Sequence, residues 1–274
     1  MKILQESWED FQKRNLTTYY ETVLIDRAIP DVRDGLKPIG RKLIWVMHKE
    51  KFGSSGKFIK CARVTGLTTL YSPHGTASSY DALCKMLIEF NNNQPLVKGH
   101  GGFENIHGDP NSAERYSESK LQKFTEEVML KNLNEYVVDF VPNFDRSTIE
   151  PSVLPSKLPY ILINGSFGTA AGAFSSSLPP HSIKSSIDIT IDSIKNPEKS
   201  MKDLIEDNKF YPEFPHGGIV DISNLAGLYS GTHSGSIQIK SRIQKVTDVP
   251  YKGKKYDALI VTEIPYMQRM NNII

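Results

Sequence analysis

In the first half of the chain, apolar residues recur at the three- and four-residue spacing of an amphipathic helix. The spacing is clearest over residues 76–90, where one side of the predicted helix carries Leu83, Met86, Leu87 and Phe90. We expect Thr76 to be its N-cap, because a threonine hydroxyl can accept a backbone hydrogen bond from the first turn. Less regular patterns predict helices over residues 1–25, 41–49, 58–70 and 119–133.

After residue 160 the pattern changes to short segments that are rich in β-branched residues. Ile237, Ile239 and Ile243 keep the two-residue period of a strand. Strands are predicted over residues 160–164, 218–222, 236–246 and 258–264, with one helix over residues 183–194. The proline-rich segment 151–159 separates the two patterns, so we expect an α+β chain with a domain boundary near residue 155.

The helices predicted over residues 58–70 and 76–90 are separated by the breaker sequence Ser-Pro-His-Gly at 72–75. Two short helices joined by a tight turn, after a basic helix, have the outline of a helix-turn-helix that reads DNA. Residues 91–118 are rich in Gly, Asn and Pro and lack periodicity. This segment is predicted to be a long loop or wing, and loops of this length are usually functional or disordered.

The composition excludes several classes of protein. Among the 274 residues, 39% are hydrophobic and 23% are charged, which is typical of a folded globular chain. The apolar runs are far shorter than the ~18–20 residues that span a bilayer, and the N-terminus lacks the apolar core of a secretory signal. Cys61 and Cys84 are too few for a disulfide framework or a thiolate zinc site. We therefore expect a cytoplasmic protein without a membrane partner.

Positive charge is concentrated in one stretch, although the net charge of the whole chain is only +2. Residues 33–63 contain nine lysines and arginines against Asp34 and Glu50. Such a block forms either an ordinary solvated face or a surface for a polyanion such as nucleic acid. Charge alone does not decide between these two interpretations.

Two other patterns have plain structural explanations. A group of histidines and aspartates lacks the paired helical spacing of a zinc site, so loop hydrogen bonding is preferred and no metal site is predicted: His74, Asp81, His100, His107 and Asp109. The glycine-rich sequence at 165–172, GSFGTAAG, lacks the Gly-Lys-Ser/Thr ending of a phosphate-binding loop. We interpret it as a tight connection from a strand to a helix.

The pair Arg115-Tyr116 lies at the end of the long loop predicted over residues 91–118. A phenol has a pKa of about 10, so only about one in a thousand is ionised at neutral pH. An adjacent guanidinium favours the phenolate and can also hold a phosphate. The pair therefore suits attack on a phosphodiester, although the chain contains 12 tyrosines and position alone does not single this one out.

Six ordered motifs carry a resemblance to a known family: RAIPDVRDGLKPIGRK, SPHGTASSYD, GHGGFENIHGDPNSAERYSESKL, LPYILINGSFGTAAG, LPPHS and VTEIPY. In this order and spacing they closely resemble the breakage-reunion (A-type) subunit of type IIA DNA topoisomerases, of the bacterial gyrase A and topoisomerase IV kind. The resemblance runs from about Arg27 to the last residue.

The resemblance implies roles for individual residues. Tyr116 corresponds to the nucleophile that forms a transient 5′-phosphotyrosine, and Arg115 to the arginine that steadies the pentacovalent phosphorane. Arg27 and His74 are implied to act at the scissile phosphate. Further DNA contacts are implied for Lys37, Arg41, Lys42, Ser78, Asp81 and Thr169.

Three positions depart from the family pattern. Ala77 stands where the family has its drug-contacting serine, while the acidic partner is kept as Asp81, so fluoroquinolone sensitivity is in doubt. Gly40 replaces the usual histidine. Thr169 replaces an isoleucine that wedges between base pairs, and because a smaller, polar side chain opens a base step less well, we expect a weaker or shifted kink in the DNA.

The resemblance also implies an architecture. Residues 1–26 would form a helical arm that packs on the ATPase partner, residues 27–155 a winged-helix breakage-reunion domain, and residues 156–274 the first part of a β-rich tower domain. Because the family's A-type core is much longer, we expect a C-terminally truncated chain, either a fragment or one piece of a split subunit. A viral or phage origin fits a split polypeptide.

In the implied reaction the Tyr116 oxygen attacks phosphorus, the ribose 3′ oxygen leaves, and the phosphotyrosine conserves the bond for religation. The family takes Mg²⁺ and ATP from a separate ATPase/TOPRIM (B-type) subunit, so neither is expected to bind this chain alone. The expected partners are double-stranded DNA, the B-type subunit, a second copy of the A-type chain in a homodimer, and a complementing C-terminal fragment, in the nucleoid or in a host's cytoplasm.

A second interpretation stays open, namely a catalytically silent winged-helix module that binds DNA. The short C-terminus and Thr169 favour it, and the intact Arg115-Tyr116 pair opposes it. A dinucleotide or metal enzyme would require motifs that the sequence lacks. The sequence does not distinguish supercoiling from relaxation.

Overall fold

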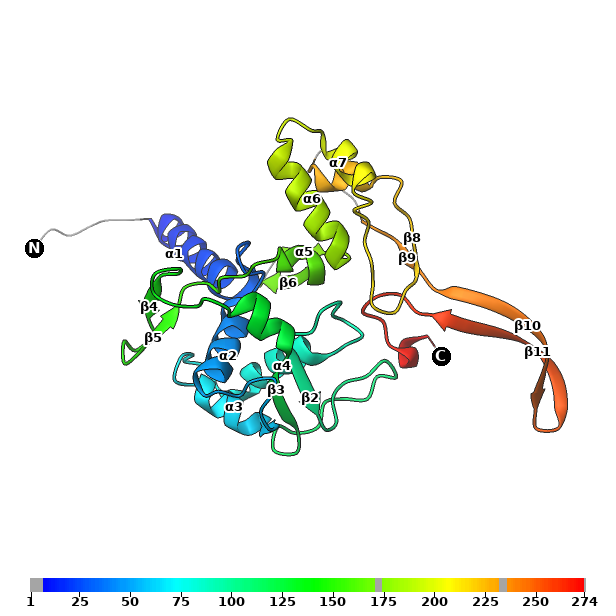
Figure 1. Cartoon of the computed structure of the whole chain (residues 1–274), viewed down its shortest axis with the longest axis horizontal. Helices are drawn as coiled ribbons and strands as arrows, with labels where there is room; N and C mark the ends of the chain where they lie inside the picture. The colour runs from blue at the N-terminus through cyan, green and yellow to red at the C-terminus, as the bar shows by residue number, and fades with distance from the viewer. Residues whose placement is uncertain (1–6, 171–173, 232–235, 274) are drawn as a thin grey trace, which may run out of the picture.

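The computed structural model describes residues 7–170, 174–231 and 236–273. Helix α1 (Trp8–Val23) projects from the rest of the chain and continues into a π-helical turn, η1 (Leu24–Ala28) (Figure 1). Ser7 caps α1, because its hydroxyl accepts a hydrogen bond from the N–H of Asp10. The helix predicted for the N-terminus is thus confirmed over 8–23, and residues 1–6 lie outside the described part.

The first compact part of the chain packs three helices against a small antiparallel sheet. The helices are α2 (Pro38–Lys49), α3 (Cys61–Thr68) and α4 (Thr76–Leu87). The sheet has the order β1-β3-β2, with β1 (Ile59–Lys60), β2 (Val97–His100) and β3 (Glu118–Leu121). One core of buried apolar side chains joins helices and sheet, including Leu43, Ile44, Met47, Val64, Leu83, Leu96 and Leu121.

Two further elements complete this part. A π-helical turn, η2 (Thr125–Met129), follows the sheet, and a short hairpin pairs β4 (Phe140–Pro142) with β5 (Ile149–Pro151). The hairpin is held to the helices by the Asn143 side chain, which donates a 2.6 Å hydrogen bond to the carbonyl of Leu70.

The second part of the chain has its own, smaller core. Its elements are α5 (Tyr160–Asn164), the hairpin of β6 (Ser166–Ala170) and β7 (Phe174–Leu178), α6 (Ile183–Lys195), α7 (Met201–Asp207), α8 (Leu225–Tyr229), and the paired strands β8 (Ile219–Val220) and β9 (Ile239–Lys240). The buried cluster between these helices consists of Ile189, Leu204, Ile205, Phe210 and Leu225.

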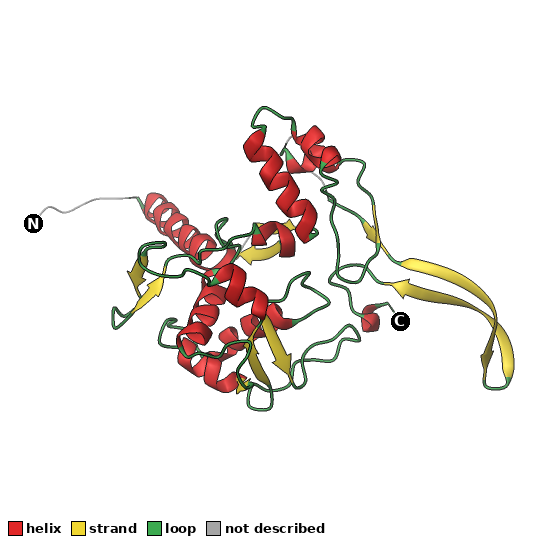
Figure 2. Ribbon diagram, viewed as in Figure 1, coloured by secondary structure: helices red, strands yellow, loops and turns green. Residues whose placement is uncertain are grey.

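A two-stranded ribbon extends from this second part (Figure 2). Strands β10 (Arg242–Tyr251) and β11 (Lys254–Glu263) pair antiparallel and are joined by a tight turn at Lys252 and Gly253, both at positive φ. Such a two-residue turn matches the twist of the strands it connects. The strands predicted over 236–246 and 258–264 are confirmed within β9, β10 and β11.

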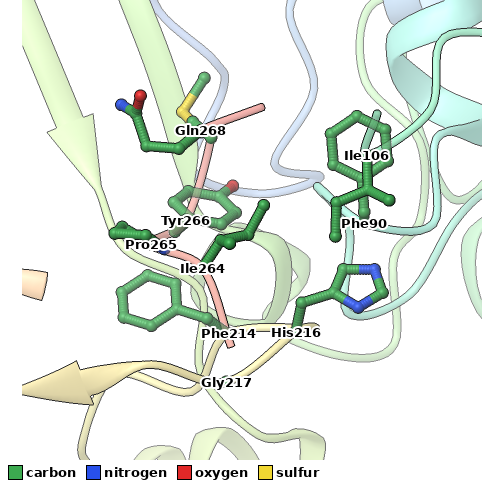
Figure 3. A pocket seen from close by; sticks show the side chains of 10 residues that line it. Phe90, Ile106, Phe214, His216, Gly217, Ile264, Pro265, Tyr266 and Gln268 are labelled. Atoms are coloured by element: carbon green, nitrogen blue, oxygen red, sulfur yellow. The ribbon is translucent and has the colours of Figure 1, made fainter. Parts of the chain in front are cut away.

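The segment after β11 returns to the first part of the chain. Tyr266 donates a hydrogen bond to the carbonyl of Asn91 at 3.0 Å, and the Arg269 Nε donates to the carboxylate of Glu104 at 2.7 Å. A short 3₁₀ turn, η3 (Met270–Asn272), follows. Figure 3 shows the small pocket at this junction, which is lined from both parts of the chain by Phe90, Ile106, Phe214, His216, Ile264 and Tyr266.

Several predictions of local structure are wrong. Residues 160–164 form helix α5 rather than a strand, because a short apolar run does not distinguish the two states. The glycine-rich sequence follows helix α5 and itself contains strand β6, so the predicted order of a strand and then a helix is wrong. The helix predicted over 119–133 is replaced by β3 and the π-helical turn η2. Gly75, and not Thr76, is the N-cap of α4.

Candidate functional site

Tyr116 lies at the end of the long loop that joins β2 to β3. Its side chain is 65% exposed. The guanidinium carbon of Arg115 lies 4.6 Å from the centre of the Tyr116 ring, so the two side chains that the sequence singled out are in contact. A cation at this distance interacts favourably with the aromatic face.

The neighbours of Tyr116 tie this loop to the helices. Ser117 is fully buried, and its carbonyl accepts a 2.9 Å hydrogen bond from the N–H of Cys61, the first residue of α3. The Glu114 carboxylate accepts hydrogen bonds from Thr65 of α3 and Thr76 of α4. The structure thus brings Arg115 and Tyr116 to the two helices on either side of the turn at 72–75.

The turn before α4 and the first turns of α4 present polar side chains to solvent. His74, Ser78 and Asp81 are exposed. Ser78 donates a 3.1 Å hydrogen bond to the carbonyl of Gly75, which closes the first turn of the helix. The opposite side of α4 carries the buried Leu83 and Leu87, as its sequence pattern predicts.

Lys37 joins α2 to the β6–β7 hairpin. Its ammonium donates a 2.6 Å hydrogen bond to the carbonyl of Phe167. Burial, and then the positive charge of Lys85, lowers the pKa of Lys37.

The backbone of η1 approaches the same hairpin very closely. A Cβ atom placed on Gly168 would lie 2.7 Å from the carbonyl oxygen of Ala28, and the side chain of Arg27 next to it is exposed. Thr169 follows Gly168 in β6, where it pairs with Ser175. The side chain of Thr169 lies outside the described part of the structure, so its predicted role as a wedge stays a prediction.

Arg41 and Lys42 lie deeper than their basic motif suggests. The Arg41 guanidinium binds the buried carboxylate of Asp34, with Nε 2.6 Å from Oδ2. The Lys42 ammonium lies 3.2 Å from the Glu150 carboxylate and 2.5 Å from the carbonyl of Tyr71. Both cations are therefore committed to partners within the chain.

Much of the basic stretch is neutralised in the same way. Ion pairs connect its cations to carboxylates, linking Arg33 to Asp31, Arg41 to Asp34, Lys42 to Glu150, Lys60 to Glu118 and Arg63 to Glu50. The stretch is therefore not a uniform positive surface. Exposed cationic or hydrogen-bonding side chains also come from outside this stretch, as Arg27 and Arg115 show.

Within the described ranges, no group of three or more His, Cys, Asp or Glu side chains is arranged to hold a metal ion. The described carboxylates near Tyr116 are instead hydrogen-bonded to hydroxyls or paired with cations, as Glu114 and Glu118 show. Among all the residues that the structure describes, no helix is long and apolar enough to cross a bilayer.

Comparison with known proteins identifies the family. The sequence model that describes the A-subunit of DNA gyrase/topoisomerase IV matches residues 27–274, which include the loop, the helices and the hairpin described above. The chain belongs to this family. The match confirms the resemblance carried by the six motifs, and it supports an α+β chain of the gyrase A type.

Individual members of the gyrase A family are similar in sequence to this chain over most of its length. The chloroplastic/mitochondrial DNA gyrase A-subunit of Arabidopsis thaliana is 39% identical over 258 residues, which cover 94% of this chain and 27% of the relative. The DNA gyrase A-subunit of Campylobacter jejuni is 37% identical, over 97% of this chain and 30% of the relative. The DNA topoisomerase 4 A-subunit of Synechocystis is 36% identical, over 97% of this chain and 29% of the relative. The chain thus spans about three tenths of the length of these relatives.

The sequence did not reveal which carboxylates hold these basic residues and the loop in place. Asp34 and Glu150 hold the cations of α2, and Glu114 holds the loop, yet none was singled out from the sequence. Asp34 and Glu114 do stand within two of the family motifs, directly beside basic residues. The partners of Glu114 and Glu150, however, lie far along the chain, on elements that only the fold brings together.

Proposed function

We propose that this chain is part of the DNA-breaking and rejoining subunit of a type II DNA topoisomerase and that Tyr116 forms a transient 5′-phosphotyrosine. The observation that carries the proposal is the exposed Tyr116 phenol in contact with the Arg115 guanidinium, on a loop bonded to α3 and α4. An exposed phenol can reach a phosphodiester, and a neighbouring cation stabilises the phenolate that attacks it.

We further propose that residues 27–155 form a winged-helix domain. Helices α3 and α4 flank the turn at 72–75, and β2 and β3 frame a long loop in the position of a wing. Residues 1–26 would be an arm and residues 156–274 the first part of a tower domain. The separate buried clusters around Leu43 and around Leu204 support this division.

In the proposed reaction, the Tyr116 oxygen attacks phosphorus in line and the ribose 3′ oxygen leaves with the electron pair of the broken bond. Arg115, Arg27 and His74 would contact the phosphate oxygens, where cationic or hydrogen-bonding side chains offset developing charge. Reversal of the same step rejoins the strand, so the phosphotyrosine conserves the bond without a further energy source.

The DNA contacts proposed for other residues divide into two groups. Lys37 at the start of α2, Ser78 and Asp81 on α4, and Thr169 on β6 would contact the duplex. For Arg41 and Lys42, the partners Asp34 and Glu150 support a framework role that keeps α2 in place beneath the DNA. Thr169 would open a base step less effectively than an apolar wedge.

Mg²⁺ and ATP would enter through a B-type partner that carries ATPase and TOPRIM domains. The metal would stabilise charge on the leaving oxygen. The residues described in this chain do not form such a site themselves. The complete assembly would contain DNA, two A-type subunits, the B-type partner and any complementing C-terminal polypeptide, and it would act in the cytoplasm at the nucleoid.

Covalent capture tests the proposed function. The full assembly is mixed with supercoiled plasmid and Mg²⁺ and then denatured, and protein-linked DNA is measured. Tyr116→Phe is expected to abolish the linkage, because it removes the attacking oxygen. Tyr136→Phe is the matched control, since Tyr136 is also an exposed tyrosine. Equally low linkage in the wild type and in Tyr116→Phe, with DNA still bound, would instead establish a silent DNA-binding module.

A further inference from the structure

The position of the Tyr116 phenol depends on its backbone rather than on packing. With 65% of its surface exposed, the ring is not enclosed by neighbouring side chains. An exposed side chain with free rotation is a poorly oriented nucleophile unless the backbone that carries it is fixed. The contacts of residues 114–117 therefore determine where the phenol can go.

One anchor of this backbone lies after Tyr116. The buried carbonyl of Ser117 accepts a hydrogen bond from the N–H of Cys61 at 2.9 Å. Earlier in the loop, the carbonyl of Ser112 accepts a 2.6 Å hydrogen bond from the hydroxyl of Tyr80, which projects from α4. These contacts hold the loop to α3 and α4 through its main chain.

The other anchor is the side chain of Glu114, two residues before Tyr116. Its carboxylate accepts a 2.7 Å hydrogen bond from the hydroxyl of Thr65 and a 3.3 Å hydrogen bond from the hydroxyl of Thr76. Its carbonyl also accepts a 3.2 Å hydrogen bond from the N–H of Ala62. A single side chain thus connects the second turn of α3, the first residue of α4 and the loop.

The chemistry of the contact suits a carboxylate. The N-cap of α4 is Gly75, which has no side chain to accept hydrogen bonds from the first turn. A negative charge beside the first turn of a helix is stabilised by the helix dipole. Hydrogen bonds to an ionised acceptor are stronger than those between neutral groups. The Glu114 carboxylate therefore adds hydrogen bonds that link the loop to both helices.

We propose that Glu114 is a positioning residue for Tyr116, because its carboxylate ties the backbone that carries the phenol to α3 and α4; this inference rests on the proposed function. Glu114 does not touch the reacting atoms. It restricts the directions from which the Tyr116 oxygen approaches phosphorus.

Single-turnover cleavage tests the proposal. The full assembly, with Mg²⁺, cleaves an end-labelled DNA duplex, and the rate of covalent linkage is compared with the dissociation constant for the same duplex. Because misplacement by about 1 Å can cost about 100-fold in rate, Glu114→Ala is expected to slow linkage about 10- to 100-fold while DNA affinity changes less than about twofold. Glu114→Gln, which keeps an acceptor and gains a donor, is expected to recover most of the rate.

Two sets of variants make the test specific. Thr65→Val and Thr76→Val remove the same hydrogen bonds from the helices and are expected to slow linkage too. In the Thr65→Val/Thr76→Val background, Glu114→Ala is expected to have little further effect, since contacting residues are coupled. Glu89→Ala removes an exposed carboxylate of the same part of the chain and is expected to leave the rate unchanged.

The outcomes distinguish this proposal from the proposed function. If Glu114→Ala links DNA at the wild-type rate while Tyr116→Phe links none, the positioning role is refuted and the function stands. Equal losses of DNA affinity and linkage rate would also refute it, because they indicate a merely structural role. Linkage that survives Tyr116→Phe would overturn the proposed function and the positioning role with it. If Glu114→Ala does not fold, the linkage rates of Glu114→Gln, Thr65→Val and Thr76→Val decide whether Glu114 positions Tyr116.

Discussion

The Arg41 guanidinium and the Asp34 carboxylate form a two-point ion pair inside the protein. Nε lies 2.6 Å from Oδ2 and Nη2 lies 3.1 Å from Oδ1, and Asp34 has no exposed surface. The same carboxylate accepts hydrogen bonds from the N–H groups of Leu36 and Leu154, each at 2.9 Å. The pair therefore connects the start of α2 to the segment that leads into the second part of the chain.

Arg41→Ala is expected to destabilise the protein by about 3–5 kcal/mol, because it leaves a buried carboxylate without its cation. Arg33→Ala is the matched control, since Arg33 forms an ion pair with Asp31 while 62% of its side chain is exposed, and such surface pairs contribute about 0–1 kcal/mol. Urea unfolding followed by circular dichroism measures both. Equal losses in the two variants would show that burial of the Asp34 pair does not matter.

Gly168→Ala is expected to cost about 1–3 kcal/mol, because overpacking forces the backbone to move. The added methyl group would lie 2.7 Å from the carbonyl oxygen of Ala28, so η1 and the β6–β7 hairpin must separate. Gly66→Ala is the control, since a Cβ there meets no atom within 4 Å and alanine is favoured over glycine by about 0.5–1 kcal/mol within a helix such as α3. Thermal unfolding measures both variants; a stable Gly168→Ala protein would contradict the close approach.

His181 is expected to make the stability of the second part depend on pH. It is fully buried, with Nδ1 3.0 Å from the carbonyl oxygen of Leu162, to which it donates, and Nε2 2.6 Å from the Tyr229 hydroxyl, from which the neutral ring accepts. Burial lowers the pKa of His181 to about 4. Because the unfolded histidine has a pKa of about 6.5, the unfolded state binds the extra proton between these values, and stability falls by about 3 kcal/mol as the pH drops from 6.5 to 4.

Urea unfolding at a series of pH values measures this dependence. His181→Gln, which does not titrate, is expected to lose the slope that His181 contributes between pH 6.5 and 4, although it lowers stability at neutral pH. His107→Gln changes an exposed histidine and should keep the wild-type slope. An unchanged slope in His181→Gln would mean that other groups cause the acid sensitivity.

The sequence predicts some elements well and others poorly, for physical reasons. Helices α4 and α6 carry long amphipathic patterns, and both were predicted near their observed bounds. The five residues of α5 are too few to show a period, and Pro159 precedes them in either state. The length of the amphipathic pattern, more than the composition, therefore explains why α4 and α6 were predicted and α5 was not.

The candidate site shows a similar division. Arg115 and Tyr116 are adjacent in the chain, so the sequence alone predicts that they act together, and the structure places their side chains in contact. The partner of Lys42 was not predicted, because Glu150 lies more than 100 residues away in the sequence and reaches Lys42 only through the fold.

The contact between Arg269 and Glu104 joins residues 165 positions apart. Closing so large a loop is entropically costly, so other contacts must first bring the two segments together. During synthesis, moreover, the segment around Glu104 emerges long before Arg269 exists to bind it. The loop that leads to Tyr116 gains this tether only when translation has passed residue 269, so the growing chain carries the loop without it while the segment between Glu104 and Arg269 is synthesised.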